Sequence, residues 1–567
     1  METQPRKPIN TFKALLCVLN AKYVHCSPAP YCLAAGVFAY APHINAEVCE
    51  ATINEKESDI KERILAKCPS VVTFSCYIWN ITATLSLAAK IKKERSDIVI
   101  VLGGPEVSYS AEDVLKNNPF IDYILSGEGE ESLPALLDAI ANNKPLIGID
   151  GLCRINGDTA EIQAPCVLKG TPVNPYTNEY LSALSGRIAY LETSRGCPYS
   201  CAFCLSGRCG KPRYFDMDEV YRRILTLANS GAETIKLVDR TFNANPRHAN
   251  AILRFILQNY GNAIPYGVCF HFEIAGDILT SETMSLFESA PRGAFQLEIG
   301  IQSLSEETLV AVRRKTDMAK LWQNLRRVIS SGNMHVHIDL IAGLPYEGIE
   351  SFAKGFNTAY ALGANMLQLG FLKLLYGSAM REESAEFPCE YSKTPPYEVL
   401  STPWLSPEDI GILKGVEDAL ERLYNSGRFR LTLIYVLKAT CLTPFELFAK
   451  IGAAPAKTGL DDYIAHVKDV FAALDNVDEQ ALRDAMVEDY LSTNSAGRLP
   501  CALRIYDDRL KTAVKLLASN VNTAPKSGIK RSVALLYGEK SIAFVDYTQK
   551  DAVTGRYVLL KMRIDFL

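Results

Sequence analysis

Short apolar runs alternate with amphipathic helical stretches from Phe12 to about Asn142. The apolar runs are FKALLCVLN, AEVCEAT, SVVTFSCY, DIVIVLGG and IDYILSGEG, and stretches such as NITATLSLAAKIKKER separate them. Strands that alternate with helices form parallel sheets that helices cover on both faces. The pattern therefore predicts a doubly wound, five-stranded parallel sheet of the Rossmann or flavodoxin type, with ligand-binding loops at the carboxyl ends of its strands.

A second alternating series begins after a connector. Residues 146–186 contain the turn sequences NGD and NPYTN and predict a linker. The apolar runs that follow are IAYLETS, TIKLVD, YGVCFHFEI, AFQLEIGIQ, VHIDLIAGLP and MLQLGFLKLL, and they begin roughly 30 to 45 residues apart, as in strand–helix units. Six such units predict a partial TIM barrel, (β/α)6, over residues 187–400, with its chemistry at the carboxyl ends of the strands.

The last part of the chain has a different pattern. Residues 401–567 contain helical stretches such as SPEDIGILKGVEDALERLYNSG and DEQALRDAMVEDYLS, and they end with the β-type runs RSVALLYGEKSIAFVDYT and GRYVLLKMRI. This pattern predicts a mainly helical C-terminal domain with a few terminal strands, of unknown role, which we expect to close over the mouth of the barrel. The predicted order is an α/β domain at 1–145, a linker, a barrel and this C-terminal domain.

Length and charge narrow the class of protein. The 567 residues are enough for several domains, and the formal net charge of −4 provides no overall basic charge for holding a phosphate backbone, so no nucleic acid is indicated. The start METQPRKPIN lacks the apolar core of a signal peptide, and no run reaches the ~18 apolar residues of a transmembrane helix. We expect a cytoplasmic monomer or homodimer without a membrane partner.

Four cysteines stand close together in LETSRGCPYSCAFCLSGRCG, at positions 197, 201, 204 and 209. A disulfide is disfavoured in a reducing compartment. Zinc sites use four ligands, in two cysteine pairs or with histidines, and neither arrangement is present nearby. Three thiolates at the spacing of the first three cysteines suit an iron–sulfur cluster instead, and three ligands for four irons leave one iron open.

The stretch RGCPYSCAFC resembles the signature of the radical S-adenosylmethionine (radical SAM) enzymes. The cysteine spacing, the preceding Arg-Gly, the proline after the first cysteine and the aromatic Phe203 all match. The resemblance implies a [4Fe-4S] cluster held by Cys197, Cys201 and Cys204, with S-adenosylmethionine bound to the open iron and beside Phe203. Cys209 lies outside the motif, and we expect a loop thiol there rather than a ligand.

The resemblance continues along the predicted barrel. IGIQSLSEETLVAVRRKT and HIDLIAGLP are similar to the corresponding stretches of the coproporphyrinogen dehydrogenase branch of the superfamily. This similarity implies that S-adenosylmethionine is held by Gln302, Arg314 and Asp339, with Glu273 in FHFEIAGD as a further acidic contact. The glycine-rich motif of the superfamily is replaced here by LVDRTFNAN, in which Asp239 is the matching residue. For each of these residues, a structural salt bridge is the alternative.

An α/β domain directly before a radical SAM barrel resembles the cobalamin-binding subclass of these enzymes. The resemblance covers about 380 residues. The Asp-x-His-x-x-Gly loop, whose histidine ligates cobalt in other cobalamin domains, is absent, and KYVHC does not replace it. The subclass commonly binds cobalamin without such a histidine, so we do not assign His25 as a cobalt ligand.

The loops after the predicted strands supply the candidate cobalamin contacts. In SCYIWN, Tyr77 and Trp79 follow the third strand, where the lower face of a corrin ring would lie, although packing under a helix is an equal alternative. The loops LGGPEV and SGEGE contain four glycines, namely Gly103, Gly104, Gly127 and Gly129. Because glycine has no side chain, the corrin or its nucleotide tail could approach the backbone at these positions. A dinucleotide is the rival ligand, but no G-x-G-x-x-G follows the first strand.

The family resemblance implies a function. The leading hypothesis is an enzyme that uses a [4Fe-4S] cluster, S-adenosylmethionine and cobalamin to methylate an unactivated carbon, where a 5'-deoxyadenosyl radical abstracts hydrogen and the carbon radical takes a methyl group from methylcobalamin. The alternatives are a radical rearrangement, ring contraction or cyclisation without methyl transfer, and a non-catalytic cofactor-binding or sensor protein. We expect an electron donor such as flavodoxin or ferredoxin and a small-molecule or peptide substrate. No residue is assigned as catalytic.

Overall fold

The computed structural model describes residues 12–454, 459–495, 498–519 and 533–563. The chain divides into two compact units. The first unit contains residues 1–273 and 373–399, and the second contains residues 274–372 and 400–567. The two units are described separately below.

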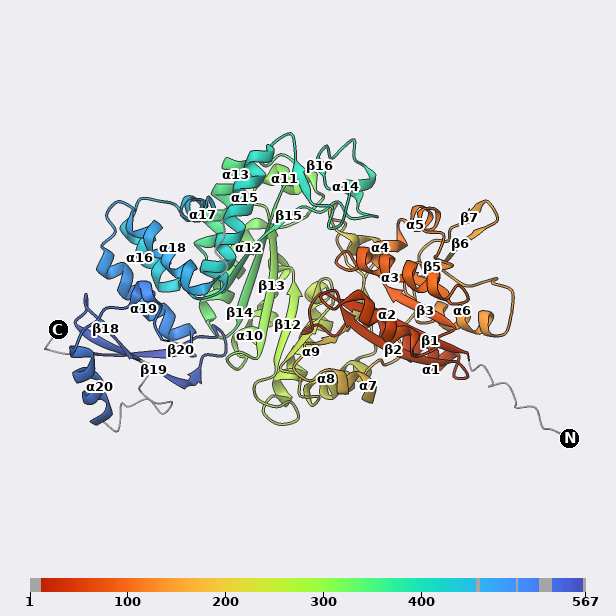
Figure 1. Ribbon diagram of the computed structural model, residues 1–567, viewed down its shortest axis with the longest axis horizontal. Coiled ribbons are helices and arrows are strands. Elements are labelled where there is room, and N and C mark those ends of the chain that lie inside the picture. The colour runs from red at the N-terminus through yellow and green to blue at the C-terminus, as the bar shows by residue number, and fades with distance from the viewer. Residues whose placement is uncertain (1–11, 455–458, 496–497, 520–532, 564–567) are drawn as a thin grey trace. The chain divides into compact units, whose positions relative to one another are not determined.

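A seven-stranded sheet forms the N-terminal part of the first unit, in the order β2-β1-β3-β4-β5-β6-β7 (Figure 1). The first five strands are parallel, in the order expected of a flavodoxin-like sheet, and this confirms the prediction of a doubly wound domain. The strands are β1 (Lys13–Asn20), β2 (Asn45–Thr52), β3 (Val71–Ser75), β4 (Val99–Gly103), β5 (Tyr123–Leu125), β6 (Leu152–Asn156) and β7 (Thr159–Glu161).

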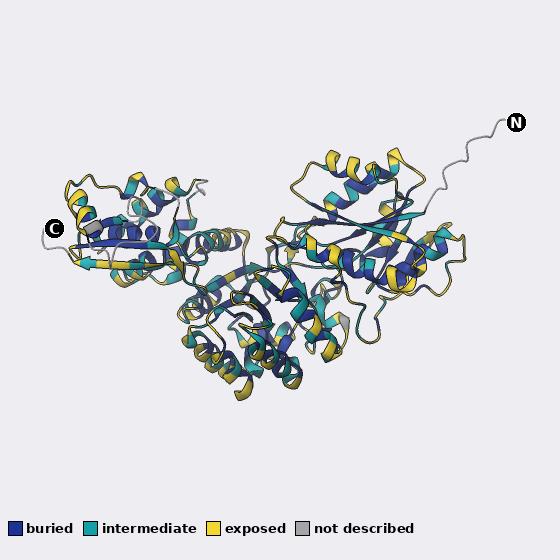
Figure 2. Cartoon of the chain, turned by 90° about the horizontal axis from the view of Figure 1, so that it is seen from below, coloured by how far each residue is buried: buried dark blue, intermediate teal, exposed yellow. Residues whose placement is uncertain are grey.

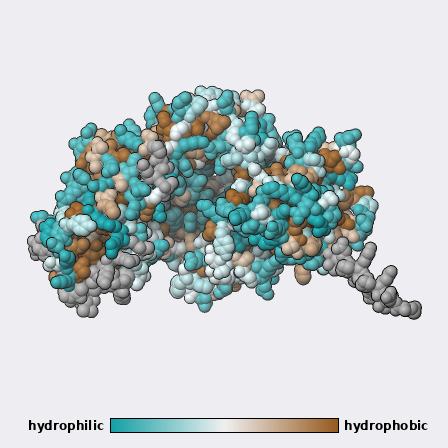
Figure 3. Space-filling view, in the orientation of Figure 1, coloured by the Kyte–Doolittle hydropathy of each residue, from teal (hydrophilic) through white to brown (hydrophobic). Residues whose placement is uncertain are grey.

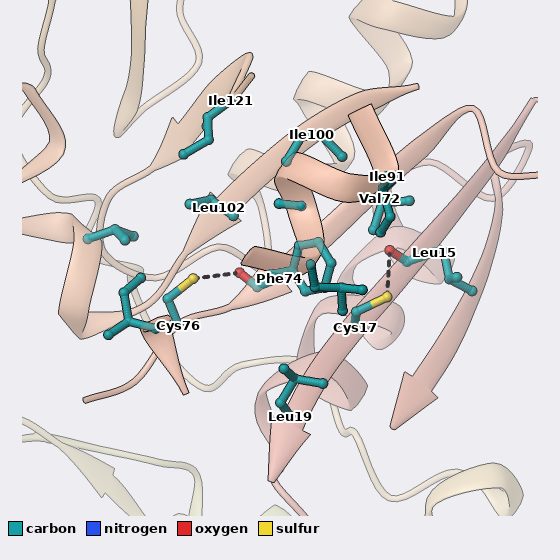
Figure 4. Close-up of a cluster of buried hydrophobic side chains, with 14 of the residues drawn as sticks. Leu15, Cys17, Leu19, Val72, Phe74, Cys76, Ile91, Ile100, Leu102 and Ile121 are labelled. Carbon is teal, nitrogen blue, oxygen red and sulfur yellow. Dashed lines mark hydrogen bonds between the residues drawn. The ribbon is translucent and has the colours of Figure 1, made fainter. Parts of the chain in front are cut away.

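Helices cover both faces of this sheet because side chains alternate along each strand. Leu15, Cys17 and Leu19 of β1 pack with helices on one face, whereas Ala14 and Leu16 pack on the other. Figure 2 shows the buried strands between partly exposed helices, and Figure 4 shows the first of these apolar clusters. The helices are α1 (Ala29–Tyr40), α2 (Glu57–Leu65), α3 (Ile81–Glu94), α4 (Pro105–Ser108), α5 (Ala111–Asn117) and α6 (Ser132–Ala141).

Part of the predicted linker belongs to this sheet. β6 pairs antiparallel with β5, and β7 pairs antiparallel with β6. Leu152 and Cys153 of β6 are buried, and the sequence NGD forms the tight turn between β6 and β7, where Gly157 has φ +60°. The turn was recognised in the sequence, but the strands beside it were too short to predict.

The six predicted barrel strands are all present, in the sheet order β15-β14-β13-β12-β11-β8. The first unit contributes β8 (Ala189–Leu191), β11 (Thr234–Leu237) and most of β12 (Cys269–Ile274). It also contains the short strands β9 (Ser194–Arg195), β10 (Arg213–Tyr214) and β16 (Glu390–Tyr391), and helices α7 (Asn178–Ala183), α8 (Met217–Ala228), α9 (Pro246–Asn259) and α14 (Ala379–Glu382).

The second unit contains the other barrel strands and the C-terminal region. The strands are β13 (Phe295–Gln302), β14 (His335–Ala342) and β15 (Met366–Phe371), and the helices among them are α10 (Ser281–Glu288), α11 (Glu306–Ala311), α12 (Met318–Ser331) and α13 (Ile349–Tyr360). Strand β17 (Val399–Ser401) leads into the unit's second part. The prediction of a partial parallel barrel is confirmed.

The C-terminal region is helical and ends in a small antiparallel sheet, as predicted. Its helices are α15 (Pro407–Leu420), α16 (Arg430–Ala439), α17 (Pro444–Gly452), α18 (Leu460–Ala472), α19 (Glu479–Thr493) and α20 (Arg509–Ser519). Capping boxes begin α15 and α17. The strands, in the order β18-β19-β20, are β18 (Val533–Leu536), β19 (Ser541–Lys550) and β20 (Tyr557–Arg563).

Among the described residues, no single helix has both the length and the apolar character needed to cross a bilayer. Helices α16 and α17 together have that length and character, but the chain bends by 113° between them. On the face drawn in Figure 3, hydrophilic side chains predominate and hydrophobic ones lie in separate groups.

A buried carboxyl group follows β14. Glu347 is 2% exposed, and its Oε1 accepts a hydrogen bond of 2.7 Å from Ser303 Oγ. Burial raises the pKa of Glu347 to about 7, against the opposing effect of this hydrogen bond. Because the folded-state pKa lies above the unfolded value, the stability that Glu347 contributes at low pH is lost as the pH rises through about 7.

We therefore expect Glu347→Gln and the wild type to unfold at nearly the same temperature at pH 4. At pH 8 the variant should unfold at a higher temperature, because it is then more stable than the wild type by about 3 kcal/mol. Thermal unfolding at both pH values measures this difference. Glu350→Gln, at an exposed position on α13, is the control. Equal unfolding temperatures of Glu347→Gln and the wild type at pH 8 would contradict the prediction.

Candidate functional site

The three motif cysteines lie on one loop of the first unit. Strands β9 and β10 pair antiparallel and close residues 196–212 into a loop. The backbone N–H of Cys197 donates to Gly210 O at 3.2 Å, and that of Cys204 donates to Cys201 O at 3.0 Å. Gly196 has φ +100°, and a Cβ there would lie 2.7 Å from Lys211 O. The base of the loop therefore requires this glycine.

The thiols of this cysteine loop have polar neighbours suited to thiolates. Cys201 is buried, Cys197 and Cys204 are half-buried, and all three are outside disulfides. The Ser206 N–H donates to Cys204 Sγ at 3.4 Å, and Thr241 Oγ1 lies 3.5 Å from Cys197 Sγ. Such contacts tune the potential of a thiolate-bound cluster. Phe203, in the same turn, is half-buried.

Two predicted S-adenosylmethionine contacts in this unit already have partners within the chain. Asp239 is 1% exposed and accepts hydrogen bonds from Thr193 N at 3.0 Å, Thr193 Oγ1 at 2.7 Å and Ser194 Oγ at 2.5 Å. Burial raises its pKa to about 6 despite these bonds. Asp239 thus fixes the chain just before the cysteine loop. Glu273 lies 3.3 Å from Lys236 Nζ.

A cavity of about 360 Å³ lies within the first unit, at the carboxyl ends of the N-terminal strands. Its volume is in the range of small-molecule and cofactor sites. Five of the six predicted cobalamin residues line it, namely Tyr77, Gly103, Gly104, Gly127 and Gly129. The chain from Glu192 to Gly196, which leads into the cysteine loop, supplies part of the same wall.

Two of the lining glycines are required by the packing of the chain itself. Gly104 has φ +106°, and a Cβ there would lie 2.5 Å from Cys76 O. Gly127 has φ +90°, and a Cβ there would overlap the backbone of Cys166. The close backbone contacts therefore require glycine at both positions, and the approach of a ligand to them stays a prediction. That packing keeps the loops clear of the cavity.

The two predicted aromatic residues form a pair. The rings of Tyr77 and Trp79 stack at 4.4 Å with an interplanar angle of 4°. Tyr77 lines the cavity, whereas Trp79 is 45% exposed, stands outside the lining and donates from Nε1 to Leu19 O at 3.3 Å. His25 also stands outside the lining, with Nδ1 2.7 Å from Tyr190 Oη.

Sequence reasoning missed a group of charged residues on the cavity wall. Glu128, Glu130, Glu192 and Arg195 all line the cavity and are joined by ion pairs. Burial alone would raise the pKa of Glu128, but the hydrogen bond from Arg213 and the charge of Arg195 lower it. The two glutamates of SGEGE and the arginine before the first motif cysteine were the features of the sequence that could have indicated this group.

The remaining predicted residues gather in the second unit. Gln302 lies at a β-bulge and has φ +73°. Its side-chain amide lies so close to Gly300 that a Cβ on Gly300 would overlap it. Arg314 Nη2 donates to Gly300 O, and Asp339 is the register partner of Gly300 on β14. Asp339 Oδ1 lies 2.8 Å from His337 Nε2. Gln302, Arg314 and Asp339 thus all lie around Gly300, and their contact with S-adenosylmethionine stays a prediction.

Comparison with known families matches three parts of the chain. Residues 26–137 match the B12 binding domain, and residues 191–358 match the Radical SAM superfamily. The chain therefore combines a B12 binding domain with a domain of the Radical SAM superfamily. Its C-terminal region matches, over residues 385–536, a family described as "Protein of unknown function (DUF4080)".

The curated proteins that this chain resembles include two methylating enzymes. The chain is 25% identical to a 2-(S-pantetheinyl)-carbapenam-3-carboxylate methyltransferase of Streptantibioticus cattleyicolor over 309 residues, 52% of this chain and 45% of that protein. It is 25% identical to the hopanoid C-3 methylase of Methylococcus capsulatus over 306 residues, 51% of this chain and 56% of that protein. The chain thus spans about half the length of the curated relatives it matches.

Solved structures share the fold. One is the radical S-adenosylmethionine methyltransferase TsrM from Kitasatospora setae with cobalamin and a [4Fe-4S] cluster bound, with a TM-score of 0.55, 17% identity, and coverage of 70% of this chain and 81% of that one. Another is the cobalamin-dependent S-adenosylmethionine radical enzyme OxsB with aqua-cobalamin and S-adenosylmethionine bound, with a TM-score of 0.59, 14% identity, and coverage of 91% and 82%.

The residues of the cysteine loop and of the cavity fit a [4Fe-4S] cluster and cobalamin, the groups that the two matched domains imply. Three thiols on one closed loop suit a cluster with an open iron. The cavity ends in loops held back by Gly104 and Gly127, so a planar ligand can reach the strand ends.

Proposed function

We propose that this protein is an enzyme that methylates an unactivated carbon of a small-molecule or peptide substrate. One observation carries the proposal. The wall of the cavity continues, within one compact unit, into Arg195 and Gly196, the residues directly before the first motif cysteine. A corrin in the cavity would therefore lie beside the cluster loop. The names of the carbapenam and hopanoid relatives, both methylating enzymes, support the same function.

Each group has candidate residues. Cys197, Cys201 and Cys204 would hold the [4Fe-4S] cluster, and the five predicted residues that line the cavity, Tyr77 among them, would hold cobalamin. Gln302, Arg314 and Asp339 would contact S-adenosylmethionine, and Phe203 and Glu273 are further candidate contacts. Asp239, predicted as a sixth contact, would act through the chain that it fixes before the cysteine loop, because Thr193 and Ser194 already occupy its carboxylate. When bound, the cluster with S-adenosylmethionine supplies a carbon-centred radical, and cobalamin supplies a transferable methyl group.

The chain's own residues orient and shield these groups. Arg314 offers a guanidinium to a carboxylate, while Asp339 accepts hydrogen bonds from hydroxyl or ammonium groups. The apolar face of Tyr77, backed by Trp79, would keep water and side-chain ligands from the lower face of the corrin. An external reductant is required, and a flavodoxin or ferredoxin is our candidate.

The substrate test uses a labelled methyl group. Reconstituted protein, a reductant and S-adenosylmethionine with a deuterated methyl group would be added to the metabolite extract of a strain that lacks the gene. We expect one metabolite to gain the deuterated methyl group, as measured by mass spectrometry. A consumed metabolite whose product carries no deuterated methyl group would overturn methylation in favour of rearrangement or cyclisation.

Asp339→Ala is expected to weaken S-adenosylmethionine binding by about 2 to 5 kcal/mol. The reason is that the charged group of S-adenosylmethionine that donates to Asp339 would be buried without a partner. Isothermal titration of the cluster-loaded protein measures the affinity. The control is Asp317→Ala, which removes an exposed N-cap of α12. Unchanged affinity in Asp339→Ala would remove this residue from the site.

The spectrum of bound Co(II) cobalamin tests the lower face of the corrin. We expect an electron paramagnetic resonance signal without nitrogen superhyperfine splitting, because His25 is held by Tyr190 and Tyr77 lines the cavity. His25→Ala should leave this signal unchanged, whereas Tyr77→Ala should alter it by admitting water. A nitrogen splitting that disappears in His25→Ala would contradict the assignment.

A further inference from the structure

Arg195 is enclosed by three glutamates. Its Nη2 lies 2.7 Å from Glu130 Oε1 and 2.7 Å from Glu192 Oε2, and its Nη1 lies 3.3 Å from Glu128 Oε2. The side chain of Arg195 is 14% exposed and that of Glu130 is 6% exposed. Buried ion pairs of this kind are weak evidence for a stabilising role, because removing the charges from water is costly. Their location suggests a different role.

The glutamates lie on a tightly held loop of the N-terminal domain. Glu128 and Glu130 follow β5, in the loop that forms one wall of the cavity. The Leu168 N–H donates to Glu128 Oε2 at 3.0 Å, and Arg213 pairs with the same carboxylate. A Cβ on Gly36 of α1 would overlap Glu130 O. With close contacts on both sides, this loop has little freedom to move independently of Arg195.

Arg195 itself belongs to the cysteine loop. It lies on β9, two residues before Cys197, and β9 pairs with β10 to close the loop. Its neighbour Gly196 is held by the close approach of Lys211. A shift of the Arg195 guanidinium is therefore a shift of the base of the cysteine loop. Arg195, Glu128, Glu130 and Glu192 also all face the cavity.

We propose that Arg195 is a positioning residue that couples the cobalamin cavity to the cysteine loop, so that cobalamin and the cluster bind cooperatively. This inference rests on the proposed function. A corrin that covers the cavity would exclude water from the four charged side chains and strengthen their pairing. The strengthened pairing fixes the base of the cysteine loop. Coupling is reciprocal, so an assembled cluster would raise cobalamin affinity by the same factor, which we set at about tenfold.

The test compares cobalamin affinity with and without the cluster. Hydroxocobalamin is titrated, by absorbance, into cluster-reconstituted protein and into the same protein before reconstitution. We expect about tenfold tighter binding to the reconstituted wild type. In Arg195→Gln both forms should still bind cobalamin, with affinities that differ by less than twofold. Adding cobalamin should also change the electron paramagnetic resonance spectrum of the reduced cluster in the wild type but not in Arg195→Gln.

Two further variants make the result decisive. Arg208→Gln is the matched control, because Arg208 holds the other end of the same loop through Gly377 O and Glu382, away from the cavity. It should keep the tenfold ratio. Glu130→Gln removes one partner of Arg195 with little change of shape and should reduce the ratio, and it decides the matter if Arg195→Gln does not fold.

The outcomes separate the two proposals. A wild-type ratio of one, or an unchanged ratio in the Arg195 and Glu130 variants, would overturn the coupling and leave the proposed function intact. If neither wild-type form bound cobalamin, the proposed function would fail, and the coupling with it.

Discussion

Alanine at Cys197, Cys201 or Cys204 is expected to abolish the cluster absorbance near about 400 nm, whichever of the three is replaced. Each thiolate supplies one of three bonds to the cluster. With two protein ligands left, two irons would be open and the cluster would be lost during anaerobic reconstitution. Iron and sulfide content after desalting, together with the absorbance spectrum, measures the loss.

Cys209→Ala is the control for this experiment. Cys209 is on the same loop but outside the motif spacing, so this variant should retain a full cluster. Loss of the cluster in Cys209→Ala, together with its retention in Cys204→Ala, would show that the ligands were assigned incorrectly.

Gly127→Ala is expected to lower cobalamin affinity by about 100-fold. At φ +90° an alanine is strained, and its Cβ would overlap the backbone of Cys166, so the loop carrying Glu128 must shift. A shift of that loop changes the wall of the cavity. Absorbance titration with hydroxocobalamin measures the affinity.

Gly170→Ala separates strain from steric overlap. Gly170 has φ +85°, close to that of Gly127, but a Cβ there would meet nothing within 4 Å. This variant carries a similar backbone strain without the clash, and it should bind cobalamin like the wild type. Equal losses of affinity in both variants would mean that the overlap with Cys166 is not the cause.

The layered domains could be predicted because they depend on local patterns. Apolar runs separated by helical stretches specify parallel strands, and all six predicted barrel strands formed where the pattern placed them. The cysteine loop was recognisable for a similar reason, since its spacing lies within one short segment. β6 and β7 escaped prediction because their pairing with β5 depends on contacts that a short run does not reveal.

Contacts between distant segments explain what was missed at the site. Arg195 meets Glu128 and Glu130 across 67 and 65 residues of sequence, and no period in the chain encodes that pairing. The requirement for glycine at position 127 also depends on a distant segment. It comes from contact with Cys166, which belongs to a segment that was predicted to be a linker. Trp79 was placed at the end of the correct strand, but its hydrogen bond to Leu19 depends on the neighbouring strand.

We propose that this protein is a cobalamin-dependent radical SAM methyltransferase, and measuring the products made from S-adenosylmethionine is the sharpest test of that proposal. Anaerobic protein reconstituted with cluster and cobalamin would be incubated with reductant, S-adenosylmethionine and the substrate-containing extract. We expect 5'-deoxyadenosine and S-adenosylhomocysteine both to form, because one molecule of S-adenosylmethionine supplies the radical and another the methyl group. Formation of 5'-deoxyadenosine without S-adenosylhomocysteine, or of neither product, would contradict it.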